Sequence, residues 1–292
     1  MTLGGPPGEG RRLLVATAVA HHIQQADWDR PGLAEARNEI ISLFTTQFDY
    51  THLTDLGLNP TRAQLTDQLR ALCRREVTPQ DHLVIYFAGH GEILDATNEH
   101  VLLTSDTYPD DIEDALRTEE LARKLLLGTP VQRLLLLLDT CYSGQGGNEL
   151  AATALQGMQR DWDPGGGLVV VTSALPAEQA EVAAFPALLR EAVDNLATAG
   201  YTPRSLNIDA VVTAMDASEH RPPYQRIGWT PVGLTGHPPD FLPNPRHRPQ
   251  LTDIDLYLQD VTEWDAQAER RNLKYRRRFL VRAMGGPTEG TS

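Results

Sequence analysis

Short, nearly continuous runs of apolar residues recur along the first two thirds of the chain. They lie at Leu13–Val19, His82–Ala88, Arg133–Asp139 and Gly167–Ser173. Strands that are buried on both faces of a parallel sheet have this pattern, because neither face carries alternating polar residues. Segments with helical spacing separate the runs, so the pattern predicts an α/β fold with a mainly parallel central β-sheet flanked by helices on both faces.

The segments between these runs predict helices. A helix over Gly32–Gln47 would have one apolar face, formed by Leu33, Ala36, Ile40, Leu43 and Phe44. Another begins after Pro60, where Thr61 and Gln64 have the spacing of a capping box. Further helices are expected within 118–127, 185–200 and 206–215, with a short extended segment near Tyr50–Leu53 and a short strand at 100–104.

Proline becomes frequent from Pro222 onward, so we expect the sheet to end near Trp229. One domain over residues 11–246 accounts for all the predicted strands. Residues 247–292 are expected to form a charged C-terminal helical tail or linker, with a helix over Asp253–Arg282. No internal repeat is present.

Composition narrows the class of protein. Lys and Arg total 26 against 39 Asp and Glu, a formal net charge of −13, which argues against a nucleic-acid partner. No apolar run approaches the roughly 18 residues of a membrane span, and the first residues do not have the pattern of a signal peptide. We therefore expect a cytoplasmic protein with no membrane partner.

The two cysteines, Cys73 and Cys141, have different surroundings. Cys73 continues the helical spacing of Leu65, Leu69 and Leu72, which predicts a buried packing role. Cys141 follows the apolar run 133–139 directly, where packing alone does not explain it. Two cysteines in 292 residues do not suggest a disulfide framework.

His90 in YFAGHGE and Cys141 in LLLDTCYSG each follow a predicted strand. Catalytic groups collect at the carboxyl ends of parallel strands, and neighbouring strands lie only about 4.8 Å apart. A thiol needs a base to form the attacking thiolate, and imidazole can also protonate the leaving amine. We therefore predict a Cys141–His90 dyad, with the N–H groups of Gly91 and Cys141 holding the oxyanion.

The segments DHLVIYFAGHGE and RLLLLLDTCYSG resemble the paired histidine and cysteine motifs of the caspase-like peptidases, peptidase C14, in their bacterial and metacaspase form. The separation of 141 − 90 = 51 residues is close to the family's spacing of about 50. The resemblance extends over Leu13–Arg246, including FLPNPR. It implies the caspase-hemoglobinase fold and a cysteine endopeptidase whose dyad needs no third acid.

The resemblance also implies a substrate preference. Asp139, two residues before Cys141, matches the metacaspase pocket aspartate, and GLAEARNEI resembles a metacaspase helix motif that puts Asn38 and Glu39 on its asparagine and second acid. Two carboxylates suit a guanidinium, so we predict cleavage after Arg and, less efficiently, after Lys. A turn cap at Asp139 and a solvated helix charge at Glu39 are the alternatives.

Two further properties of relatives bear on this chain. Many metacaspases depend on calcium, but the corresponding region here offers Glu99, Glu119, Glu120 and Asn148, a poorer set of ligands, so we expect no metal site and no cofactor. Relatives are often cut between the cysteine strand and the next. Arg160 is the single basic residue between Tyr142 and Gly167, and is either a self-processing site or an inert surface arginine.

Two other classes of function remain as alternatives, a binding protein without catalysis and a different kind of enzyme. A catalytically silent caspase-like adaptor or scaffold would have no chemical need for His90 and Cys141. GHG or GQGG could be read as a phosphate loop of a nucleotide-binding protein, but the chain contains neither a Walker loop nor GxGxxG. It also lacks the GxSxG motif of a serine hydrolase. The partners expected are a protein or peptide substrate and, from bacterial relatives, a fused or associated sensor or effector domain in a cell-death, stress or defence pathway.

Overall fold

The computed structural model describes residues 10–157, 162–163, 165–199, 203–233 and 239–248. The chain divides into two compact units, one of residues 1–197 and 205–245 and the other of residues 198–204 and 246–292. All helices and strands reported below belong to the first unit. The predicted helix over Asp253–Arg282 lies outside the described residues, and the predicted domain boundary at residue 246 stays a prediction.

A six-stranded sheet forms the centre of the first unit, in the order β2-β1-β3-β7-β8-β9. Its strands are β1 (Arg12–Ala18), β2 (Thr51–Leu53), β3 (His82–Ala88), β7 (Arg133–Asp139), β8 (Gly167–Thr172) and β9 (Gly228–Val232). The first five are parallel, and β9 pairs antiparallel with β8 at the edge. The mainly parallel sheet is confirmed, and it ends at the strand that contains Trp229, as predicted.

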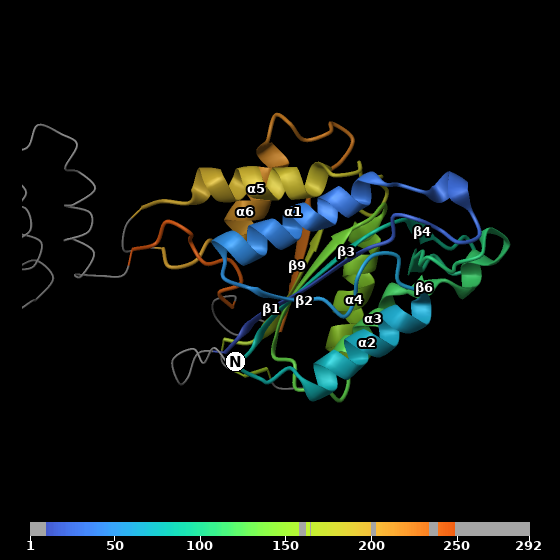
Figure 1. Ribbon diagram of the computed structural model, residues 1–292, viewed down its shortest axis with the longest axis horizontal. Helices are drawn as coiled ribbons and strands as arrows, with labels where there is room; N and C mark the ends of the chain where they lie inside the picture. The colour runs from blue at the N-terminus through green and yellow to red at the C-terminus, as the bar shows by residue number, and fades with distance from the viewer. Residues whose placement is uncertain (1–9, 158–161, 164, 200–202, 234–238, 249–292) are drawn as a thin grey trace, which may run out of the picture. The chain divides into compact units, whose positions relative to one another are not determined.

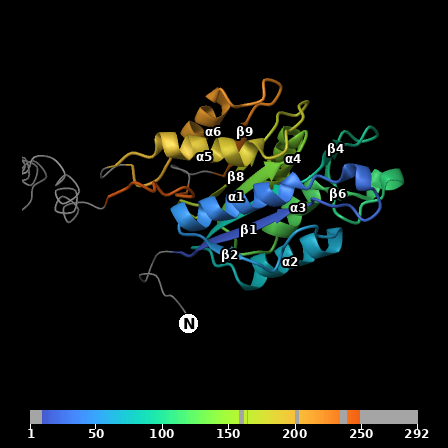
Figure 2. The same cartoon turned by 45° about the horizontal axis from the view of Figure 1, so that its top comes forward.

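Helices cover both faces of this sheet, as Figures 1 and 2 show. One layer contains α1 (Gly32–Gln47), α5 (Ala184–Leu196) and α6 (Ile208–Ala217). The other contains α2 (Arg62–Arg75), α3 (Thr118–Leu126) and α4 (Ser143–Gly157). The predicted arrangement of helices on both faces is confirmed.

The continuously apolar sequence of strand β7 is explained by its position between the two helix layers. Leu135 and Leu137 belong to the core cluster that includes α1 and α5, whereas Leu134, Leu136 and Leu138 belong to the cluster that includes α2 and α3. Each of the five leucines is at most 2% exposed. Successive side chains of a strand point to opposite faces, so a strand between two helix layers needs apolar residues at every position.

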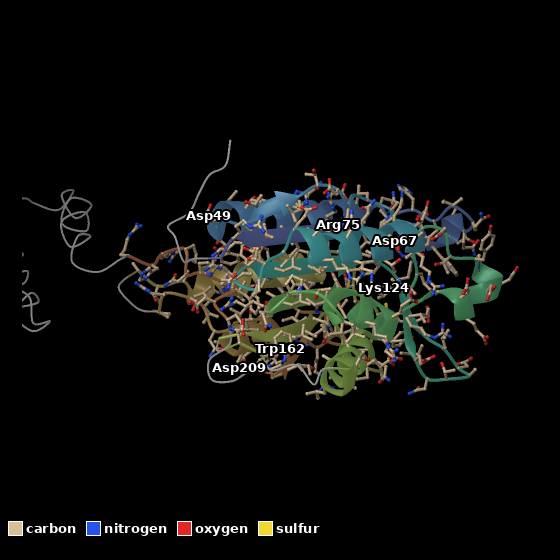
Figure 3. All side chains as sticks on the ribbon, turned by 90° about the horizontal axis from the view of Figure 1, so that it is seen from below. Asp49, Asp67, Arg75, Lys124, Trp162 and Asp209 are labelled. Atoms are coloured by element: carbon tan, nitrogen blue, oxygen red, sulfur yellow. The ribbon has the colours of Figure 1, made fainter. Side chains whose placement is uncertain are left out.

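The helix signals in the sequence also act locally. Thr61 Oγ1 accepts the Gln64 N–H at 3.2 Å, and Gln64 Oε1 accepts the Thr61 N–H at 2.9 Å, which is the predicted capping box of α2. Charged side chains such as Asp67 and Arg75 lie on the outer side of this helix (Figure 3). Cys73 lies on its inner side and is fully buried, as predicted.

A second sheet of three short antiparallel strands follows the carboxyl end of β3. It contains β4 (Gly91–Ile93), β5 (His100–Leu102) and β6 (Leu116–Arg117) in the order β4-β5-β6. The sequence predicted only the middle strand, whose residues begin the largely apolar segment 100–104, whereas β4 and β6 lie in no comparable apolar segment. Within the described part of the chain, no helix has both the length and the apolar character to cross a membrane.

Candidate active site

The register of β3 and β7 places His90 and Cys141 at one edge of the sheet. The two strands pair in parallel with Ala88 opposite Asp139, and the Gly89 N–H donates to the Asp139 carbonyl oxygen at 3.3 Å. His90 and Cys141 are each two residues beyond this last pair. They therefore leave neighbouring strands at the same level, as the sequence predicted.

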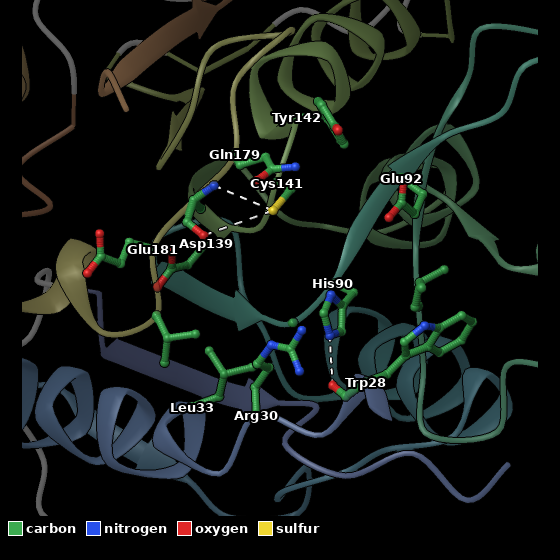
Figure 4. A pocket seen from close by; sticks show the side chains of 14 residues that line it. Trp28, Arg30, Leu33, His90, Glu92, Asp139, Cys141, Tyr142, Gln179 and Glu181 are labelled. Atoms are coloured by element: carbon green, nitrogen blue, oxygen red, sulfur yellow. Dashed lines mark hydrogen bonds between the residues drawn. The ribbon is translucent and has the colours of Figure 1, made fainter. Parts of the chain in front are cut away.

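Both side chains line a cavity of about 410 Å³. Figure 4 shows Cys141 and His90 on opposite walls of it. Trp28, Arg30 and Leu33 contribute from the segment between β1 and the first turn of α1. The segment 179–182, which precedes α5, forms a further wall.

His90 is held by one ring nitrogen. Its Nε2 lies 2.7 Å from the Trp28 carbonyl oxygen, and because a carbonyl can only accept, Nε2 carries the proton and donates it. In the neutral ring Nδ1 is then an acceptor, and Figure 4 shows it on the side of the ring that faces Cys141. Burial lowers the pKa of His90, and the Arg30 charge adds to this although the Trp28 hydrogen bond opposes it.

Cys141 has a thiol that is protonated at neutral pH in the absence of a base. Burial raises its pKa, and the carboxylates of Glu92 and Asp139 raise it further. The Ala180 N–H donates to Sγ at 3.4 Å and, together with the charge of Arg30, opposes this shift. A base that faces the sulfur is therefore needed to generate the thiolate.

The backbone directly after Cys141 is strained. Tyr142 has φ 56°, a left-handed conformation that costs a residue other than glycine about 1–3 kcal/mol. Its N–H donates to the Glu178 carbonyl oxygen at 2.8 Å. Strain of this kind persists where the surroundings fix the backbone, and here it turns the chain sharply between β7 and α4.

The Gly91 N–H is turned away from its neighbouring strand. Leu103 N–H donates to the His90 oxygen at 3.0 Å and Leu94 N–H to the Glu99 oxygen at 2.9 Å, so alternation makes Gly91 and Leu102 a non-hydrogen-bonded pair. A Cβ on Gly91 would lie 2.4 Å from the Cys141 carbonyl oxygen. Only glycine fits this close contact, and its N–H is free of the strand ladder, as an oxyanion donor must be.

Asp139 is buried at the inner end of the cavity and is 4% exposed. Its Oδ2 accepts the Tyr86 hydroxyl at 2.8 Å. Burial raises the pKa of Asp139 to about 6, against the effect of hydrogen bonds from Tyr86 and Ser173. A buried carboxylate without a cation is poorly solvated, so a guanidinium that enters the cavity would find a partner there.

Glu39, the second predicted pocket acid, lies close enough to Tyr86, the hydrogen-bond partner of Asp139, for its charge to raise the Tyr86 pKa, and its role in the pocket stays a prediction. It is exposed on α1 and does not line the cavity, because the helical spacing directs its neighbours Ala36 and Ile40, not Glu39, toward the core. Glu181 lines the cavity instead, and its Oε2 accepts the Tyr224 hydroxyl at 2.5 Å. Figure 4 shows Glu181 and Asp139 on the same side of Cys141.

Sequence reasoning missed Glu181 because the segment between β8 and α5 carries no periodic signal. The run Glu178–Glu181 shortly after a strand end was the available clue. Glu92 was missed as well, although it follows the His90–Gly91 pair directly; it lines the cavity on the other side of Cys141 (Figure 4).

The carboxylates considered for calcium have other partners. Each of these glutamates forms a salt bridge with an arginine: Glu99 with Arg117 at 3.0 Å, Glu119 with Arg123 at 2.6 Å and Glu120 with Arg62 at 2.7 Å. Among the residues that the structure describes, no group of three or more His, Cys, Asp or Glu is arranged to hold a metal ion. The expected absence of a metal and of a cofactor stays a prediction, as does the processing site at Arg160, which lies outside the described residues.

The chain was compared with known proteins. A model of the caspase domain matches residues 15–227. The protein GSU0716 of Geobacter sulfurreducens has a similar structure, with a TM-score of 0.51, 15% identity, and coverage of 82% of this chain and 100% of that one. The Drosophila initiator caspase Dronc gives a TM-score of 0.50 at 11% identity, with coverage of 80% and 84%. No curated sequence matches significantly.

These likenesses confirm the caspase-like fold, and the match to the caspase domain covers 213 of 292 residues (227 − 15 + 1), well over half of the chain. Proteins with this domain are cysteine peptidases, whose substrates are proteins. The chain belongs to the caspase domain family.

Proposed function

We propose that this protein is a cysteine endopeptidase in which Cys141 is the nucleophile and His90 is the general base and acid. The observation that supports this most strongly is the strand register, which presents both side chains to one cavity from neighbouring strands. The Trp28 carbonyl gives His90 the tautomer that the reaction requires.

The reaction follows from these atoms. The Cys141 thiol gives its proton to His90 Nδ1, and the thiolate attacks the carbonyl carbon of the scissile bond. The N–H groups of Gly91 and Cys141 hold the oxyanion, and His90 returns the proton to the leaving amine. Water, deprotonated by His90, then hydrolyses the thioester and releases the second product.

Substrate preference is set by the acids beside the nucleophile. Asp139 and Glu181 lie on one side of Cys141 (Figure 4), and together they provide two carboxylates for one cation. A guanidinium can donate to both through its fork of N–H groups, whereas an ammonium is a compact charge. The protein therefore cleaves after Arg in preference to Lys.

The test is a panel of fluorogenic peptides that end in Arg, Lys or Asp before the dye. Arg30 also lines the cavity and could pair with an acidic side chain, so the Asp peptide tests the opposite charge preference. The native protein should cleave Arg best, Cys141→Ala should cleave nothing, and Cys73→Ala should keep its activity because Cys73 is buried in α2. Efficient cleavage after Asp and none after Arg would refute the pocket assignment.

Charge-neutral variants test the two acids separately. Asp139→Asn and Glu181→Gln should each lower kcat/KM for the Arg peptide, whereas Glu39→Gln should not. Loss of activity in Glu39→Gln alone would favour Glu39 as the second pocket acid, as predicted from the sequence. If no peptide is cleaved at any calcium concentration, the adaptor function becomes the better explanation.

A further inference from the structure

His100, in β5, is fully buried beside the turn that carries Cys141. Its Nε2 lies 3.1 Å from the Cys141 carbonyl oxygen, and its Nδ1 lies 2.7 Å from Thr118 Oγ1. A carbonyl oxygen only accepts, so Nε2 carries the proton, and Nδ1 accepts the Thr118 hydroxyl. Both ring nitrogens of a neutral imidazole are thereby satisfied.

The backbone and the ring faces of His100 are fixed as well. The backbone N–H of His100 donates to both carboxylate oxygens of Glu149, at 2.9 and 3.1 Å, which connects β5 to α4. Two glycines pack against the ring: a Cβ on Gly91 would lie 2.6 Å from Nε2, and one on Gly146 would lie 2.5 Å from Nδ1. The glycines of GHG and GQGG therefore make room for this imidazole.

The group that His100 holds is the peptide unit after the nucleophile. Its oxygen accepts from His100, and its N–H, which belongs to Tyr142, donates to the Glu178 oxygen. Tyr142 is in the left-handed conformation, which its own side chain disfavours. If the His100 hydrogen bond were lost, this unit could rotate and move Sγ relative to His90.

We propose that His100 is a positioning residue of the active site. The N–H at its ring Nε2 fixes the Cys141 carbonyl and so holds the thiol toward His90. The inference rests on the proposed peptidase function. His100 does not touch the substrate, since it lies behind the Cys141 turn and does not line the cavity. Its ring also backs Gly91, so both predicted oxyanion donors have it as a direct neighbour.

The decisive experiment compares His100→Leu with His100→Gln. Leucine removes both hydrogen bonds, whereas the glutamine amide can still donate to the carbonyl and accept from Thr118. His82→Leu is the control, because His82 is a half-buried histidine at the first position of β3, the end of the strand away from His90 and the cavity. A misplacement of about 1 Å costs up to about 100-fold in rate.

His100→Leu should therefore lower kcat by about 10- to 100-fold with KM within about twofold, and His100→Gln should recover most of the loss. His82→Leu should keep the native kcat. The same variants are alkylated with iodoacetamide over a range of pH. The pH at which the alkylation rate of Cys141 is half-maximal, the alkylation midpoint, should rise only in His100→Leu. Native kcat and a native alkylation profile in folded His100→Leu would overturn the proposal.

Two further measurements keep the test decisive. If His100→Leu does not fold, Thr118→Val replaces it, with Thr118→Ser as the control that retains the hydroxyl; an unchanged kcat in Thr118→Val would then count against the proposal. If the native protein cleaves no peptide, the peptidase function fails, but the alkylation midpoints still decide whether His100 positions the thiol.

Discussion

Replacement of Asp139 by Asn should stabilise the protein at neutral pH, and it should also remove the proposed preference for arginine. Asparagine has nearly the same shape as aspartate, and its amide oxygen can still accept the Tyr86 hydroxyl. The substitution therefore changes little except the charge. Because Asp139 is 4% exposed, that charge is present in a poorly solvated site.

The magnitude follows from the pKa. Burial raises the pKa of Asp139 from 3.8 to about 6, a difference of about 2. At about 1.36 kcal/mol per unit, this corresponds to about 3 kcal/mol. The folded state binds the proton more tightly than the unfolded state, so the contribution of Asp139 to stability is full below pH 3.8 and is lost as the pH rises through 6.

At pH 7 Asp139→Asn should therefore raise the free energy of unfolding by as much as about 3 kcal/mol, and at pH 3.5 by almost nothing. Urea unfolding at the two pH values measures both quantities. Asp81→Asn is the control with opposite sign. Burial raises the pKa of Asp81, but hydrogen bonds from Arg11 and Thr78 outweigh it and lower the pKa overall.

Asp81→Asn should thus be less stable than the native protein at pH 7, and the loss should shrink in acid. The reasoning would be refuted if Asp139→Asn lowered the free energy of unfolding by the same amount at pH 7 and at pH 3.5. A lost hydrogen bond, and not a buried charge, would then dominate the effect of the substitution. Cleavage of the Arg peptide should fall at pH 7 in the stabilised variant.

Three other results are expected. Glu92→Gln removes a negative charge near Cys141 and should move the midpoint of its alkylation to lower pH; an unchanged midpoint would place Glu92 too far away to act. Iodoacetamide followed by mass spectrometry should label Cys141 but not Cys73, whose pKa burial raises to about 12, and labelling of both in the folded protein would contradict that burial. Leu136→Ala should lower the free energy of unfolding by about 2–5 kcal/mol in urea, whereas a loss below about 1 kcal/mol would show that its site collapses.

The elements that the sequence predicted best are those whose signals are local. The strands expected at His82–Ala88 and Arg133–Asp139 coincide with β3 and β7, and the helix expected at Gly32–Gln47 coincides with α1. Continuous apolar runs leave no choice of face, and helical spacing persists over several turns. Both members of the proposed dyad could be picked out for the same reason, since each follows closely on an apolar run.

What the sequence did not provide depends on contacts between distant segments. Glu181 reaches the cavity from a segment without a hydrophobic period, so no local signal marks it in the sequence. His100 resembled an ordinary strand residue, because Thr118, Glu149 and the Cys141 turn come together only in the folded chain.

The pairing of Ala88 with Asp139 has a consequence for insertions and deletions. His90 and Cys141, the proposed dyad, each lie two residues beyond the end of adjacent strands. One residue inserted between either strand and its member of the pair would therefore shift that side chain relative to the other. The tip between β4 and β5, Leu94–Glu99, is not subject to this constraint. A library of single-residue insertions should therefore tolerate changes at that tip and reject them at Gly89 and Thr140, even though all three places are turns.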